Sequence, residues 1–204
     1  MPLQNRVNPF GMISADPARG TLMGNRGCLH DDKQRIRRSF VGKRWIACVP
    51  EFKGRHRVVM TPGRYTELFF LDEATALAAG HRPCAECQRA RYELFRECWA
   101  PRGRVPSVDE IDRVLQAERL DSRRGKRTYV ADVSALPRGV MVADNARRPW
   151  LVQERTLAPW TPAGYGRAVA KPNGNLDVLT PRSIVRAIAR GFPVGVHRSG
   201  GGEA

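Results

Sequence analysis

The sequence predicts an α+β fold, in which a small antiparallel sheet with helices precedes a β-rich C-terminal half. Short β-branched or aromatic runs broken by Gly and Pro occupy residues 45–71, helical patterns follow over residues 72–120, and further strand patterns fill the second half. The chain has 204 residues, of which 42% are hydrophobic. This length is enough for one large domain or two small ones with a buried core.

Residues of the first half show strand patterns followed by a helix. Gly54 and the Pro62-Gly63 pair separate three apolar runs, which we expect to form an antiparallel meander over residues 45–49, 57–60 and 67–71. Asp72 is a suitable N-cap for a two-turn helix over 73–79, and Gly80 suits the position just beyond its end.

Two longer helices are expected in the middle of the chain. The apolar spacing over residues 85–99 predicts a helix whose buried face includes Cys98, with Pro101 ending it. Ser107 and Glu110 have the spacing of a capping box, so another helix should run to about Leu120. A basic turn then covers residues 123–127.

The second half is rich in strand patterns broken by proline. We expect strands at 128–133, 139–143, 150–153, 165–170 and 176–179. One helix interrupts them, with Thr180 as cap, Pro181 in its first turn and Gly191 closing it. These patterns divide the chain into a basic domain over 1–100, a helical linker over 101–127, a β-rich domain over 128–198 and a flexible tail over 199–204.

Composition indicates a cytoplasmic location without membrane association. No run of 18 apolar residues is present, the mean hydropathy is −0.44, and residues 1–20 lack the apolar core of a secretory signal. We therefore expect reduced thiols. In a reducing compartment, five cysteines are metal ligands, reactive thiols or core residues rather than a disulfide framework.

A large excess of positive charge indicates a polyanionic partner. The chain carries 35 Lys and Arg against 20 Asp and Glu, a net charge of +15. The densest basic stretch runs from Lys33 to Arg64, where the single acidic residue is Glu51. Nucleic acid is the commonest partner of such a surface. The residues that we expect to meet phosphates are Arg35, Arg37, Arg38, Lys43, Arg44, Lys53, Arg55 and Arg57.

The pair Cys84-Ala-Glu-Cys87 is the most informative motif. Two thiolates at this spacing, ahead of a helix, can chelate one soft divalent ion. A closed structural zinc site needs about four ligands, and a catalytic one needs three with an open position. A redox dithiol and two unconnected thiols remain alternatives, although the element before this pair is a helix rather than the strand of a βαβ unit.

Residues 68–88, LFFLDEATALAAGHRPCAECQ, resemble the second half of the Ada-type metal-binding domain of methylphosphotriester-DNA repair proteins. In that family a strand ending in Phe-Phe precedes a short Ala-rich helix and Gly-aromatic-Arg-Pro-Cys-x-x-Cys, whose cysteines bind zinc. The resemblance implies a zinc-stabilised DNA-binding fold with one zinc site. The family's upstream C-x3-C, which includes the methyl-accepting thiolate, is absent here, so the resemblance does not extend to methyl transfer.

The remaining ligands of such a site are open. Cys48, in the run 45–49, is our first choice and His30 the second, with Cys28 and His56 as reserves. His56 lies where the family's missing cysteine pair would fall. Cys48 is equally well explained as a core thiol of a strand.

The loop over residues 24–32 is a second concentration of reactive groups. Arg26 could hold a phosphate, and His30 with Asp31 or Asp32 could act as a ligand, a general base or an orienting pair. A metal-dependent hydrolase or nuclease using these residues is therefore an alternative function. A solvated loop or a helix cap explains the same residues without chemistry.

A third concentration is the Pro/Gly-rich segment 159–166. Trp160, Tyr165 and Arg167 could stack on a base, or the aromatic residues could close a small β-structure. The expectation from all these patterns is a zinc-binding, DNA-binding protein linked to repair or regulation, with DNA favoured over RNA. A zinc-stabilised adaptor for RNA or an acidic protein is the third alternative, and the sequence does not indicate an oligomeric state.

Overall fold

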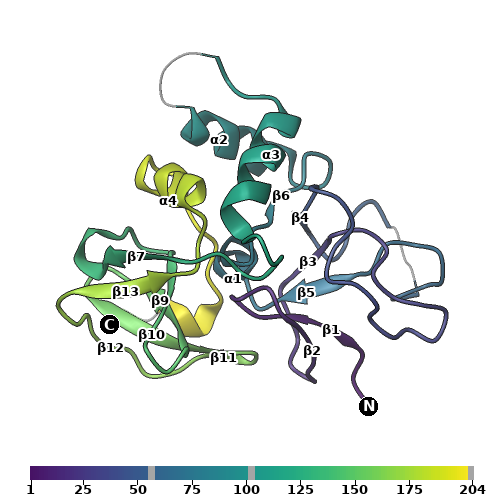
Figure 1. The fold of residues 1–204 in the computed structure, drawn as a ribbon, viewed down its shortest axis with the longest axis horizontal. Coiled ribbons are helices and arrows are strands. Elements are labelled where there is room, and N and C mark those ends of the chain that lie inside the picture. The colour runs from purple at the N-terminus through teal and green to yellow at the C-terminus, as the bar shows by residue number, and fades with distance from the viewer. Residues whose placement is uncertain (55–57, 101–103, 202–204) are drawn as a thin grey trace.

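The computed structural model describes residues 1–54, 58–100 and 104–201, and it confirms the α+β class. Two sheets lie on opposite sides of a short central helix, and three further helices lie together along one side of the molecule (Figure 1). In this view the first sheet is on the right, the second sheet is on the left, and the three helices are above.

The first sheet contains six short strands in the order β2-β1-β5-β3-β4-β6. Its strands are β1 (Gln4–Val7), β2 (Ile13–Ala15), β3 (Leu22–Asn25), β4 (Ile46–Cys48), β5 (Leu68–Phe70) and β6 (Arg82–Pro83). The sheet is mixed rather than antiparallel throughout, because β1 runs parallel to β5 and β4 runs parallel to β6. The helix between β5 and β6 returns the chain for this second parallel pairing.

The expected strand over residues 57–60 is absent from its described part. Residues 58–60 end in a turn, since Met60 has a φ of 57° and its N–H donates to the Glu67 carboxylate at 2.8 Å. The place between β4 and β5 is taken by β3. Strand β3 was not predicted because glycine is unfavourable in a strand pattern. A Cβ at Gly24 would lie 2.2 Å from the Ile46 carbonyl oxygen, so the close pairing of β3 with β4 requires glycine.

The helices of the described residues are α1 (Glu73–Ala78), α2 (Arg89–Trp99), α3 (Val108–Arg119) and α4 (Arg182–Ala189), and local sequence signals mark the ends of α1 and the start of α3. The predicted cap of α4 is wrong: Pro181 rather than Thr180 is its N-cap, and the Thr180 hydroxyl instead accepts from Met141 N–H at 3.0 Å. The Asp72 carboxylate accepts from Thr75 N–H, and Gly80 has a φ of 87° just beyond α1. The expected capping box of Ser107 and Glu110 is formed. Helix α2 begins four residues later than predicted, since residues 85–88 form turns. Within the described ranges, no helix has the length and apolarity that crossing a bilayer requires.

The second sheet is antiparallel and has the order β11-β10-β9-β8-β13-β7, with β12 paired to β10. Its strands are β7 (Tyr129–Asp132), β8 (Met141–Ala143), β9 (Pro149–Val152), β10 (Thr156–Thr161), β11 (Gly164–Tyr165), β12 (Val169–Ala170) and β13 (Asn175–Val178). The predicted strand over 165–170 is thus divided between β11 and β12. Trp160, expected in a loop, lies in β10.

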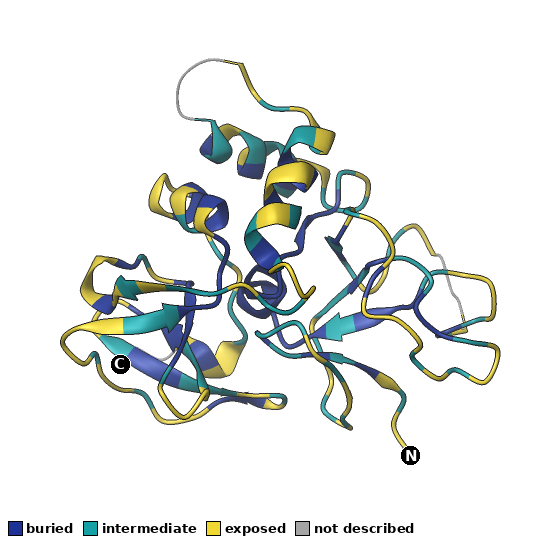
Figure 2. Ribbon diagram, viewed as in Figure 1, coloured by how far each residue is buried: buried dark blue, intermediate teal, exposed yellow. Residues whose placement is uncertain are grey.

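Helix α1 is buried along its whole length and joins the hydrophobic clusters of the molecule (Figure 2). Leu77 packs in the cluster with α2, α3, α4 and the second sheet, Ala74 packs beside Met141, and Ala76 packs with the first sheet. The cores therefore cross the predicted domain boundaries at 100 and 128. Ser199 and Gly200, expected in the tail, belong to a 3-10 turn (Arg198–Gly200) whose Ser199 hydroxyl accepts from Tyr165 N–H. A second such turn, Val133–Ala135, follows β7.

Candidate metal centre and basic surfaces

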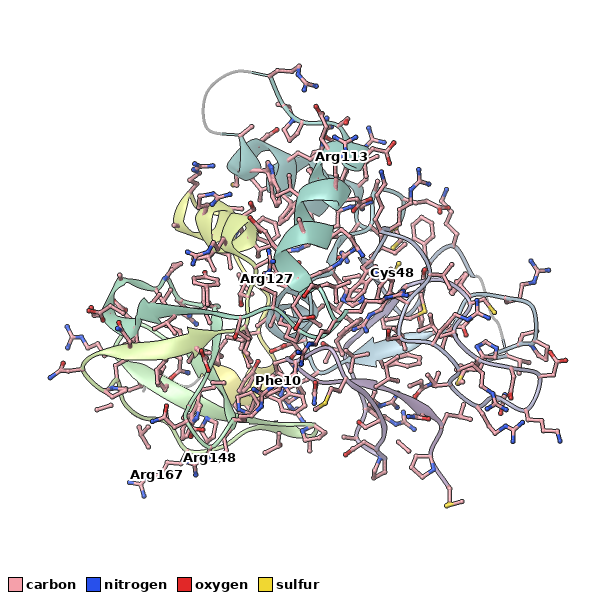
Figure 3. All side chains as sticks on the ribbon, viewed as in Figure 1. Phe10, Cys48, Arg113, Arg127, Arg148 and Arg167 are labelled. Carbon is pink, nitrogen blue, oxygen red and sulfur yellow. The ribbon has the colours of Figure 1, made fainter. Side chains whose placement is uncertain are left out.

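The sulfur atoms of Cys48, Cys84 and Cys87 lie within 4.8 Å of one another. Cys48 and Cys84 are buried and Cys87 is half-buried. Figure 3 labels Cys48, which lies in the half of the molecule that contains the first sheet. Three cysteine ligands at this separation could hold a metal ion.

Parallel pairing of β4 and β6 places two of these cysteines. Ile46 is opposite Arg82 and Ala47 is opposite Pro83, so the next residues along both strands are Cys48 and Cys84. Cys84 N–H donates to the Ala47 carbonyl oxygen at 2.8 Å. The turn after Cys84 then brings Cys87 back to the pair.

Gln88 holds this turn in place. Its backbone N–H donates to the Cys84 carbonyl oxygen at 3.1 Å, and its side-chain Nε2 donates to the Ala47 carbonyl oxygen at 2.8 Å. The side chain therefore connects the turn to β4 while the backbone closes it. Backbone pairing and this amide therefore both help to position the three cysteines.

The three thiols are electrostatically unequal. A hydrogen bond from Cys48 lowers the pKa of Cys84 to about 5, helped by the backbone N–H groups of Cys87 and Glu86 and opposed by burial. The same hydrogen bond and burial raise the pKa of Cys48, and burial raises that of Cys87. A single thiolate is thus favoured at neutral pH, and metal binding would require release of the other two protons.

A cavity of about 250 Å³ adjoins the cluster. All three cysteines line it, together with the polar side chains of Asn25, Glu67 and Glu86 and the aromatic rings of Phe52, Tyr65 and Phe69. Three sulfur ligands leave one position of a tetrahedral ion to be filled. Because all three cysteines line the cavity, a solvent molecule or a small ligand inside it could supply the fourth ligand.

Comparisons with protein-family models, with curated proteins and with solved structures found no match. The resemblance of residues 68–88 to the Ada-type domain therefore remains a prediction.

His30 and Cys28 lie apart from this cluster. The His30 Nδ1 is 2.6 Å from Thr66 Oγ1 and its Nε2 is 3.2 Å from the Thr61 carbonyl oxygen, so both ring nitrogens are engaged in fastening its loop to residues 61–66. The Cys28 thiol donates to the His30 carbonyl oxygen at 3.8 Å. The other reserve ligand, His56, lies outside the described residues.

Asp31 organises a turn. Its carboxylate accepts from the backbone N–H groups of Lys33 and Arg35 and from the guanidinium groups of Arg35 and Arg37. These bonds, led by the Arg35 N–H, hold the pKa of Asp31 well below its ordinary value. Asp32 is exposed beside it. Among the described residues, neither carboxylate belongs to the cysteine cluster or lines the cavity beside it.

Most of the expected phosphate-contacting residues are on the surface. Exposed side chains are those of Arg35, Arg37, Arg38, Arg44 and Lys53, whereas Lys43 is half-buried. Arg44 forms an ion pair of 3.5 Å with Asp109, and Lys53 lies 5.2 Å from the centre of the Phe52 ring. Arg55 and Arg57 lie outside the described residues.

The aromatic segment 159–166 packs against α1. Trp160 Nε1 donates to Thr75 Oγ1 at 3.0 Å, and the buried Tyr165 hydroxyl donates to the Asp72 carboxylate at 2.8 Å. These bonds turn the polar ends of both rings toward the helix cap. Arg167 is exposed at the surface of the second-sheet half (Figure 3).

A further basic group was only partly visible in the sequence. Arg26 and the basic turn 123–127 were noted as separate features, but the fold brings Arg26 and Lys126 to one cavity together with Arg119. Arg119 ends α3, where a basic residue is ordinary, so its sequence position carried no signal.

Proposed function

We propose that this protein binds one zinc ion through Cys48, Cys84 and Cys87 and that it binds DNA. The observation that carries the proposal is the approach of three thiols within 4.8 Å. Zn²⁺ is the common divalent partner of thiolate ligands held in a small fold. The net charge of +15 and the exposed arginines after residue 33 support a polyanionic partner.

Zinc at this position would serve a structural purpose first. It would join the end of β4, the end of β6 and the turn before α2. The resemblance to the Ada-type domain agrees with this role and supports a connection with DNA repair or regulation. The chain's lack of the upstream cysteine pair keeps methyl transfer out of the proposal.

Metal analysis of protein purified without chelator tests the zinc site. We expect one zinc per chain, lost in Cys84→Ser and Cys48→Ser. Cys28→Ser is the matched control, since this half-buried thiol lies outside the cluster, and it should retain the metal. His30→Gln should also retain it. Absence of zinc from the native protein, or equal loss in Cys28→Ser, would contradict the site.

Fluorescence anisotropy with a labelled duplex at several salt concentrations tests DNA binding. Affinity should fall steeply as salt rises, with a slope of about −0.9 per phosphate neutralised. The double variant Arg38→Gln/Arg44→Gln should make this slope shallower by about 1–2 units. Arg167→Gln, exposed on the other half, is the control. A flat affinity between low and moderate salt would rule out the proposal, and tighter binding of RNA of the same sequence would redirect it to the RNA alternative.

The cavity beside the cysteines favours one second candidate, a hydrolase with a three-coordinate protein site. The described residues supply three sulfur ligands, and Glu67 and Glu86 line the same cavity. Replacing zinc by Co²⁺ and measuring its absorption bands would distinguish four protein ligands from three with a water. Turnover of a phosphodiester that survives in His30→Gln but not in Glu67→Gln would support the hydrolase.

A further inference from the structure

A second cavity, of about 640 Å³, is lined by basic residues without any acidic one. It lies between the loops of the first sheet and the end of α3, and Phe10, labelled near the centre of Figure 3, is at its edge. The basic residues in its lining are Arg26, Arg37, Arg38, Arg119, Arg124, Lys126 and Arg147. Within the described residues, the one ion pair formed by this set joins Arg37 to Asp31.

Two of these arginines are stacked on the same tryptophan. The guanidinium carbons of Arg26 and Arg119 lie 4.1 Å and 4.0 Å from the centre of the Trp45 ring, and each residue is only 1% exposed. Arginine tolerates such burial because its delocalised charge is weakly hydrated and stacks on aromatic rings. Stacking leaves the N–H edges of the guanidinium groups available for hydrogen bonds.

The partners of these buried cations are neutral. Arg26 donates to the Gly11 carbonyl oxygen at 2.9 Å and to His81 Nε2 at 3.2 Å. Burial, followed by the charge of Arg26, holds the pKa of His81 well below its ordinary value, so this ring is an uncharged acceptor. Arg26 Nη2 is buried without a hydrogen-bond partner among the described residues.

Arg119 and Lys126 show the same pattern. Arg119 donates to the carbonyl oxygens of Gly80 at 2.9 Å and Lys43 at 2.6 Å, and Lys126 donates to that of Ala78. Asp112 attracts Arg119, but both oxygens of its carboxylate are engaged by Arg82. Burial and the two arginines lower the pKa of Lys126 to about 7. The cavity thus retains a positive charge that the described carboxylates Asp31 and Asp112 offset only in part.

A purely structural role explains this arrangement poorly. Buried charges without a counter-ion cost free energy, and apolar residues of similar size generally stabilise a core better. A doubly charged oxyanion would offset the charge and supply acceptors for the unpartnered guanidinium N–H. Arginine forks match phosphate oxygens in geometry.

We propose that this cavity binds a phosphate monoester, either the terminal phosphate of a nucleic-acid strand or that of a free mononucleotide. Arg26, Arg119 and Lys126 form the base of the site. Arg124 and Arg147, which stack on Phe40 and Phe10 at 4.4 Å and 4.9 Å, form its rim. The choice of ligand rests on the proposed DNA binding, whereas the anion site itself does not.

Titration calorimetry at constant ionic strength tests the site with inorganic phosphate, a nucleoside 5′-monophosphate and its nucleoside. We expect both phosphates to bind and the nucleoside not to bind. Lys126→Gln and Arg124→Gln should each weaken binding about tenfold or more, the loss of one charge-assisted hydrogen bond. Arg113→Gln is the matched control, since this exposed residue of α3 lies outside the cavity lining, and it should bind as the native protein does.

Folding of the variants is checked by circular dichroism. Arg124 is exposed, so Arg124→Gln should fold even if the substitution of Lys126 disturbs the interior. Phosphate binding that is absent, or that is unaffected by Arg124→Gln in folded protein, would overturn the proposal. These measurements involve neither metal nor DNA, so they can fail while the proposed function holds, and the reverse is also true.

Two oligonucleotides that differ only in a 5′-phosphate distinguish the two sources of the ligand. A phosphorylated strand that binds at least about tenfold more tightly than both the unphosphorylated strand and the mononucleotide would identify a strand end. Equal binding of the mononucleotide and the phosphorylated strand would identify a free nucleotide. A preference for neither phosphorylated ligand would overturn the site.

Discussion

The two sheets of this molecule reach order by different means. In the second sheet, β8 to β11 follow one another in both sequence and space, and their apolar faces fill two hydrophobic clusters. In the first sheet, β1 pairs with β5, β5 with β3 and β4 with β6, so most neighbouring strands are not consecutive in the chain. Both candidate sites lie in or beside this first sheet. We infer that the first sheet is stabilised by polar contacts and by metal binding to its cysteines. The second sheet is stabilised by local hairpins and apolar packing.

Metal removal should produce the largest difference in stability between the two sheets. With chelator, we expect amide exchange to accelerate in β4 and β6, while β8 and β13 stay protected. The free energy of unfolding of the first-sheet half should fall by about 5 kcal/mol or more, since structural zinc contributes about 10–16 kcal/mol in small modules. Hydrogen exchange followed by mass spectrometry measures this, with Cys28→Ser as control. Equal loss of protection in both sheets would break the comparison.

Asp112→Ala should have the next largest effect. The Asp112 carboxylate is fully buried and binds Arg82 at 2.8 Å and 2.9 Å, which connects α3 to β6 two residues before Cys84. Removing it leaves an uncompensated buried guanidinium, and such losses cost about 3–5 kcal/mol. Urea denaturation measures the change. A loss below about 1 kcal/mol would show that solvent reaches Arg82 and that the pair contributes little.

Lys126→Met should change stability in a manner that depends on pH. The pKa of Lys126 is lowered to about 7, so between pH 7 and 10 the unfolded chain binds more protons than the folded one. The stability of the native protein should therefore rise with pH through this window, relative to the variant. We expect the variant to be the more stable protein at pH 7 and to lose this advantage by pH 10, as measured by urea denaturation. A constant difference between the two proteins would contradict the lowered pKa of Lys126.

Ser107→Ala should have the smallest effect. The Ser107 hydroxyl caps α3 by accepting from Glu110 N–H, and loss of such a cap costs about 1 kcal/mol. Because α3 is anchored elsewhere by Arg82 and Asp112, we expect metal content and phosphate binding to be unchanged. A thermal scan with parallel metal analysis measures both. Loss of zinc in this variant would mean that α3 positions the cysteines more directly than its contacts indicate.

Local signals were enough to predict most helices and several strands. Asp72, Ser107 and Gly80 mark helix ends through hydrogen bonds and backbone angles that involve near neighbours, so the sequence displays them directly. Strand β3 was missed because Gly24 weakens its local strand pattern. The reason for this glycine is the close approach of β3 to β4, which exists only in the folded chain. No strand forms near residue 60 because the Met60 N–H donates to the Glu67 carboxylate rather than to a neighbouring strand.

The candidate sites show the same contrast between residues that local sequence signals reveal and residues that only the fold brings together. Cys84 and Cys87 are three positions apart in the sequence, and this spacing already indicated a shared ion. Cys48 joins them through the parallel pairing of β4 and β6, which no local pattern reveals, so it could only be chosen among several cysteines and histidines. His30, the next choice, is instead held by Thr66. The convergence of Arg26 with Arg119 and Lys126 depends on contact between two segments far apart in the sequence, which showed Arg26 and the basic turn 123–127 only as separate features.

Helix α1 has a consequence for how this chain can be divided or inherited. The helix packs against both sheets. In a fragment that stops after residue 100, α1 would lose its apolar contacts with the second sheet, which include Met141 and Val178. A fragment that begins at residue 101 would lack the helix that covers its sheet. Residues 68–88 therefore cannot be exchanged between proteins as an independent unit. Recombination that preserves either half must preserve its companion as well.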